Sequence, residues 1–216
     1  MLVKETIDRK EANLQTIEIV FHNLGLRSWI ECTLCWDCPR NDAKGCCYYN
    51  PTYYPVDFSY LYEVKPEVIK VIFSQPRITI MEKYMSVDRT EDKDGDFRCQ
   101  FHSLEGGCCW APELRESVCR FYVCPGCAIW EEEGTAIWKE FFDRLDTYEA
   151  QINKAISAEL ATRGLDLKSN AREFIKQAAQ LFKQNWDIMP AWCREYPQEQ
   201  RFLLKRPIYY GREWKL

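Results

Sequence analysis

Cysteine is the feature that most constrains this sequence. The chain of 216 residues contains 12 cysteines, and eleven of them fall within residues 32–47 and 99–127. The first residues contain no apolar export signal, so we expect a cytoplasmic location, where thiols stay reduced and structural disulfides are rare. Clustered thiols in such a compartment favour metal ligation over a disulfide framework or a redox thiol pair.

The first cysteine stretch has the spacing of a metal-binding loop. Cys32, Cys35 and Cys38 are separated by two residues each, and the pair Cys46-Cys47 follows. Such spacing presents several sulfurs to one centre, as in iron–sulfur loops, although the bacterial ferredoxin run places its fourth cysteine closer. The same spacing also suits zinc, which takes four thiolates in a tetrahedron.

The second stretch adds six cysteines: Cys99, Cys108, Cys109, Cys119, Cys124 and Cys127. The last three have the C-x4-C-x2-C spacing of plant-type two-iron loops. The chain has only two histidines, which excludes Cys2His2 zinc fingers and His-rich catalytic zinc sites. Thiolate-rich, histidine-poor ligation favours an iron–sulfur cluster, such as 4Fe-4S, and leaves zinc as the alternative cofactor.

Both stretches contribute to a longer pattern. Its elements are Cys32, Cys35 and Cys38, the Cys46-Cys47 pair, Cys99 with Phe101, and Gly107-Cys108-Cys109-Trp110 leading through Arg115 to Cys119-Arg120-Phe121. This pattern resembles the zinc- or iron-chelating family named for its C-x-x-C-x-x-C-C motif. Two departures are the seven residues between Cys38 and Cys46, and Glu116 where the family has proline. The resemblance implies metal chelation, and the related flagellin lysine N-methylases suggest methyl transfer as a further alternative.

We therefore expect eleven candidate metal ligands. The first choice is Cys32, Cys35, Cys46, Cys47, Cys99, Cys109, Cys119 and Cys124, followed by Cys38, Cys108 and Cys127. Two adjacent cysteines do not easily point into one small tetrahedron, so each adjacent pair is expected to divide between two centres or to leave one member out. Cys193 stands alone and is expected to be a buried or idle thiol.

The second half of the chain is predicted to be helical. Apolar residues recur every three or four positions over residues 137–160 and again over residues 174–182. Gly164 is placed to end the first helix, and Ser169 or Asn170 to cap the second. The two helices are expected to form a hairpin that buries its apolar face on the cysteine-rich part.

Shorter patterns complete the expected fold. Pro66 opens a short helix through Phe73, and residues 16–21 alternate like a strand. We expect an α+β, mainly helical fold, in which an irregular cysteine-rich metal-binding core packs against the C-terminal helical hairpin. Residues 1–134 form the cysteine-rich region and residues 135–216 form the hairpin and a C-terminal arm, within one cooperative domain.

Composition excludes several classes of protein. The net charge of −4 argues against nucleic acid as a partner, so the basic, aromatic arm from Pro197 onward is expected to pack on its own domain. No apolar run approaches the ~18 residues of a membrane span. No P-loop, G-x-G-x-x-G or G-x-S-x-G motif occurs.

The expected function is that of a cytoplasmic iron–sulfur protein that transfers electrons or assists a modification reaction. One alternative is a zinc-stabilised module that binds a protein partner, and another is a metal-dependent enzyme such as a protein methyltransferase. An enzyme should have a deep pocket with polar groups at its metal. A structural module should instead have closed four-thiolate sites without such a pocket.

Overall fold

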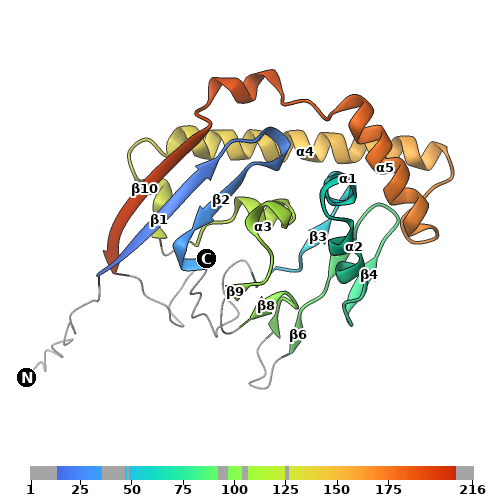
Figure 1. Cartoon of the computed structure of the whole chain (residues 1–216), viewed down its shortest axis with the longest axis horizontal. Coiled ribbons are helices and arrows are strands. Elements are labelled where there is room, and N and C mark those ends of the chain that lie inside the picture. Colours follow the sequence, from blue (N-terminus) through green and yellow to red (C-terminus); the bar gives the residue numbers. More distant parts are fainter. Residues whose placement is uncertain are drawn as a thin grey trace, which may run out of the picture.

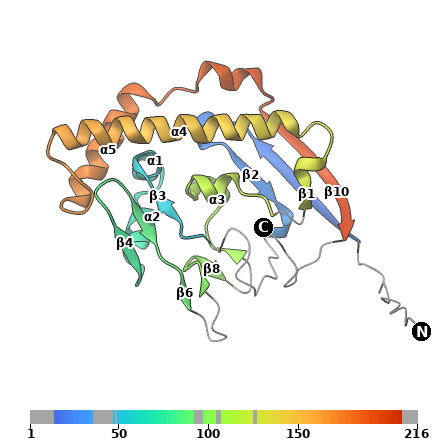
Figure 2. The same ribbon diagram turned by 180° about the vertical axis from the view of Figure 1, so that it is seen from behind.

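The computed structural model of the chain describes residues 14–35, 47, 49–91, 97–103, 107–124 and 127–207. A long helix, α4 (Ala136–Thr162), runs along the molecule and carries a β-sheet at one end and three further helices at the other (Figure 1). Seen from behind, the short helix α3 (Ser117–Phe121) lies beneath α4, between these two parts (Figure 2). The short strands β8 (His102–Ser103) and β9 (Gly107–Cys108) lie on the side of α3 that faces away from α4 (Figure 1).

The largest sheet pairs a strand from the N-terminal part of the chain with a strand from its C-terminal part. Its central strand β1 (Leu14–His22) pairs antiparallel with β2 (Trp29–Cys32) and with β10 (Glu199–Pro207). Alternate β1 residues Ile17, Ile19 and Phe21 are fully buried, and the Phe21 ring stacks on Trp138 of α4 with centroids 5.1 Å apart. The predicted strand is confirmed, as is the packing of the C-terminal arm on its own domain for residues 199–207, while residues 208–216 lie outside the described residues.

The predicted helical hairpin is confirmed. Helix α4 contacts α5 (Ala171–Asn185), the turn between them contains Gly164 at φ +69°, and the side chain of Asn170 accepts a hydrogen bond from the Glu173 amide. Most of the predicted apolar stripe of α4 is buried, but Ile137 is 41% exposed because the neighbouring Trp138 is the residue that enters the core.

Two helices cover the other end of α4. Helix α2 (Pro66–Phe73) has the predicted bounds, whereas α1 (Pro55–Val64), which packs against α5, was not predicted. A small antiparallel sheet of β3 (Thr52–Tyr53), β5 (Met85–Val87) and β4 (Ile78–Ile80) adjoins them. The apolar residues of α1 form no clear helical stripe in the sequence. The helix is held by its packing against α5.

Between residues 90 and 124, the described part of the chain forms only short elements. Two hairpins pair β6 (Thr90–Glu91) with β7 (Phe97–Arg98) and β8 (His102–Ser103) with β9 (Gly107–Cys108). Short 3-10 turns occur throughout the described chain, namely η1 (Gly25–Arg27), η2 (Thr33–Cys35), η4 (Pro112–Leu114), η6 (Ile129–Glu131) and η7 (Ala191–Glu195). The predicted α+β class is therefore confirmed, and among the described residues no helix has the length and apolarity to cross a bilayer.

Candidate metal centre

Three cysteines from distant segments form a first group, which we call cysteine group 1: Cys32, Cys35 and Cys127. Cys32 ends β2, Cys35 ends the following 3-10 turn, and Cys127 comes from the second cysteine stretch. The Cys32 thiol is hydrogen-bonded to Cys127 and to Cys35. The hydrogen bond with Cys127 raises the pKa of Cys32, and the hydrogen bond with Cys35 lowers it. Burial raises the pKa further, so that it reaches about 12. A bound metal would replace these protons, because a coordinating thiol is deprotonated.

Four further cysteines form cysteine group 2: Cys47, Cys99, Cys108 and Cys119. They line one cavity of about 20 Å³, together with aromatic side chains and Glu116. The backbone links two of them directly, since the Cys99 amide donates to the Cys47 carbonyl at 3.1 Å. A volume of this size admits roughly one water-sized sphere, so it suits a single atom better than a substrate.

The other candidate ligands lie elsewhere. Cys109 is exposed, Cys124 is half-buried with its carbonyl accepting from the Cys127 amide, and Cys38 and Cys46 lie outside the described residues. The sequence analysis ranked Cys109 and Cys124 above Cys108 and Cys127 as candidate ligands. The structure instead places Cys108 and Cys127 in the two cysteine groups. The adjacent pair Cys108-Cys109 places only its first member at the cavity, as its β-hairpin position dictates.

The donor chemistry of both groups fits a thiophilic metal, but the arrangement is not a closed site. As placed, no three His, Cys, Asp or Glu side chains within the described ranges form a group that could hold a metal ion. Binding would therefore need the thiols to converge, or ligands from outside those ranges such as Cys38 or Cys46. Such tightening is expected where metal binding is coupled to folding.

Glu116 holds the turn that carries Cys119. It is the N-cap of α3, and its carboxylate accepts from the amides of Val118 at 2.8 Å and Cys119 at 3.1 Å. The carboxyl also lines the cavity of cysteine group 2, and burial raises its pKa to about 7. The sequence showed Glu116 only as a departure from the family pattern, because glutamate is not among the preferred N-cap residues.

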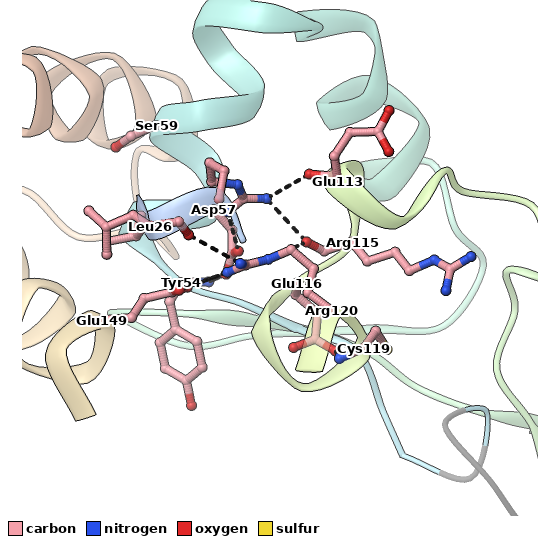
Figure 3. A network of polar contacts seen from close by, with 12 residues as sticks. Leu26, Tyr54, Asp57, Ser59, Glu113, Arg115, Glu116, Cys119, Arg120 and Glu149 are labelled. Carbon is pink, nitrogen blue, oxygen red and sulfur yellow. Dashed lines mark hydrogen bonds and ion pairs between the residues drawn. The ribbon is translucent and has the colours of Figure 1, made fainter. Parts of the chain in front are cut away.

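A buried arginine fixes the other side of α3. Arg120 is fully buried, and its Nη2 lies 2.7 and 3.0 Å from the two carboxylate oxygens of Glu149 on α4. Its Nη1 donates to the carbonyls of Leu26 and Ser28, and its Nε donates to the carbonyl of Arg115. Figure 3 shows this side chain between Glu149 and the carbonyls of Leu26 and Arg115, with Cys119 pointing away from it. All five guanidinium donors therefore have an acceptor.

A second buried arginine anchors the segment before α3. Arg27 pairs with Asp57 at 3.1 Å and donates to the carbonyls of Glu113 and Arg115. Asp57 in turn accepts from the Tyr54 amide at the start of α1. A five-residue helix is too short to be stable alone, so these contacts set the position of Cys119. Burial raises the pKa of Glu149 against the opposing effect of Arg120, and burial also lowers the pKa of Arg27.

Sequence reasoning missed this polar network because its members are spread over the chain. Arg27, Asp57, Arg120 and Glu149 come from a 3-10 turn, two helices and the short helix between them. Asp57 was a candidate polar group for a pocket at the metal and the resemblance drew attention to Arg120, but no local pattern links the four residues. Comparison of the chain with models of known families, with curated proteins and with solved structures finds no match. The family resemblance therefore stays a prediction.

Proposed function

We propose that this chain is a cysteine-ligated metalloprotein with two metal centres. Cysteine group 1 would supply Cys32, Cys35 and Cys127 to one centre, and cysteine group 2 would supply its four thiols to the other. The observation that carries the proposal is that seven cysteines, separated by up to 95 positions (127 − 32), gather at two places. A metal bound by four thiolates requires such a gathering of cysteines from distant segments.

An iron–sulfur cofactor is the first candidate, with electron transfer or assistance to a modification reaction as its role. It is supported by the ligand chemistry, because the thiols are numerous and neither group includes a histidine. A buried centre surrounded by aromatic side chains, among them Tyr53, Phe101 and Trp110, would have its reduction potential set by a low-dielectric shell.

A zinc-stabilised interaction module is the second candidate. The specific observation in its favour is the small cavity of cysteine group 2, which has room for about one ion and none for a substrate. The short strands and turns around it would then depend on zinc for their folding free energy. Both candidates use the same ligands, so the identity of the metal separates them.

The decisive experiment is to purify the full chain without oxygen and to measure iron, zinc and acid-labile sulfide per chain. Iron with sulfide supports the first candidate, and stoichiometric zinc without sulfide supports the second. The variants Cys119→Ser and Cys32→Ser should each remove about half of the metal, as expected if each disrupts one of two centres. The control Cys193→Ser should retain it, because Cys193 is buried, like Cys32, but belongs to neither group. Protein without stoichiometric metal, or equal retention in all three variants, would contradict the proposal.

A further inference from the structure

A groove unrelated to the cysteines lies along α4. It has a volume of about 560 Å³ and is formed by four separate segments, namely α4, the start of α3, the turn between β4 and β5, and Tyr54 at the start of α1. This volume is within the range of small-molecule sites. None of the groove's lining residues is a cysteine, although Ser117 and Val118 precede Cys119 on α3.

One end of the groove offers positive charge and hydrogen-bond donors. Lys83 from the β4–β5 turn and Lys154 from α4 both line it, and neither forms an ion pair with a carboxylate in the part of the chain that the structure describes. Asn153 and Ser157 of α4 line the groove as well. The Asn153 Oδ1 is occupied by the Val56 amide at 2.9 Å, which leaves its Nδ2 as the donor for the groove, and Ser157 is only 6% exposed. This end is built to hold an anion.

The middle of the groove is aromatic and its far end is acidic. The rings of Tyr54 and Tyr84 lie 5.4 Å apart and offer flat apolar faces. Asp146 lines the groove eight residues before Lys154 on the same helix, about 12 Å away along the axis. The Glu149 carboxylate also lines the groove, but its charge is committed to Arg120. A ligand that matches this groove has an anionic group at one end, a planar ring in the middle and a hydrogen-bond donor at the other end.

We propose that this groove binds a small molecule with a planar ring and an anionic group, of the size of a nucleoside monophosphate. Lys83 and Lys154 hold the anionic group, with Asn153 and Ser157 as neutral donors. The ring lies against Tyr84 and Tyr54, and an amino group at its outer edge donates to Asp146. The proposal uses no cysteine as a ligand contact, so its test is separate from the test of the proposed function.

The test is a calorimetric titration of the full chain with adenosine monophosphate, adenosine and inorganic phosphate as probes. Adenosine monophosphate is expected to bind once per chain and at least about tenfold more tightly than either fragment, since it contacts both ends. Lys83→Glu and Lys154→Glu should each weaken its binding by about tenfold or more, because each removes a charge-assisted bond. Tyr84→Leu should weaken adenosine monophosphate and adenosine alike while leaving inorganic phosphate unchanged.

Lys139→Glu is the matched control, since Lys139 is an exposed lysine of α4 that does not line this groove. Circular dichroism of each variant verifies the fold. No saturable binding of adenosine monophosphate at millimolar concentration would overturn the proposal. Equal weakening by Lys139→Glu would also overturn it, because the attraction would then be a general charge effect.

Discussion

Replacing Glu149 by glutamine tests whether the buried polar network holds α3 on α4. The network contains two arginines, Arg27 and Arg120, and two carboxylates, Asp57 and Glu149, so its charges balance. Glu149→Gln preserves the size of the side chain but leaves one positive charge uncompensated. The amide also presents a donor to a guanidinium whose own five donors need acceptors. The variant should therefore be strongly destabilised.

The magnitude follows from the burial of the pair. Arg120 and Glu149 are 0% and 2% exposed, so solvent cannot screen the unpaired charge. Breaking a buried pair by removing one partner costs about 3–5 kcal/mol, which in a chain of this length lowers Tm by roughly 6–20 °C. The matched control is Glu159→Gln, which breaks the exposed Glu159–Arg163 pair on the same helix and should cost about 0.5 kcal/mol or less.

Urea denaturation followed by far-UV circular dichroism measures both variants. The expected result is a large fall in the midpoint for Glu149→Gln with an unchanged slope, and almost no change for Glu159→Gln. If the two variants differed by less than about 1 kcal/mol, the buried pair would not stabilise the fold as argued. A change in slope would instead show that the unfolded or folded state had altered its compactness.

Three further predictions concern single residues. Trp138→Ala should cost about 3–5 kcal/mol in chemical denaturation because the indole is fully buried against the sheet, and a cost near that of a surface change would contradict this packing. Gly25→Ala should cost about 1–2 kcal/mol through its left-handed backbone at φ +61°, since an added Cβ would meet Met189 at an ordinary 3.5 Å. Hydrogen bonds from Ser169 lower the pKa of Asp166, so its contribution is present at neutral pH and lost as the pH falls through that lowered value. Asp166→Ala should therefore be less stable than the parent at pH 7, with the difference shrinking in acid; a constant difference would refute the assignment.

The sequence by itself determined the elements whose signals are local. The stripe from Phe141 to Leu160, the glycine that follows it and the Asn170 cap predicted the helical hairpin, because helix periodicity and caps depend on residues a few positions apart. The proline at position 66 likewise marked the start of α2. The helix α1 escaped this reasoning, since its apolar residues surround the helix and it is stabilised by packing on α5.

Only the tertiary structure decided which cysteines belong together. Spacing placed Cys124 with Cys127 and Cys35 with Cys38, but the fold brings Cys32 to Cys127 and gathers Cys47 with Cys119. The same holds for Arg120 and Glu149, which meet because α3 is pressed beneath α4. Contacts between distant segments depend on how the whole core closes, and a short-range pattern contains no information about that closure. The cysteine content of this chain thus predicted a kind of chemistry, whereas the packing of α3, β2 and the hairpins determined where that chemistry can occur.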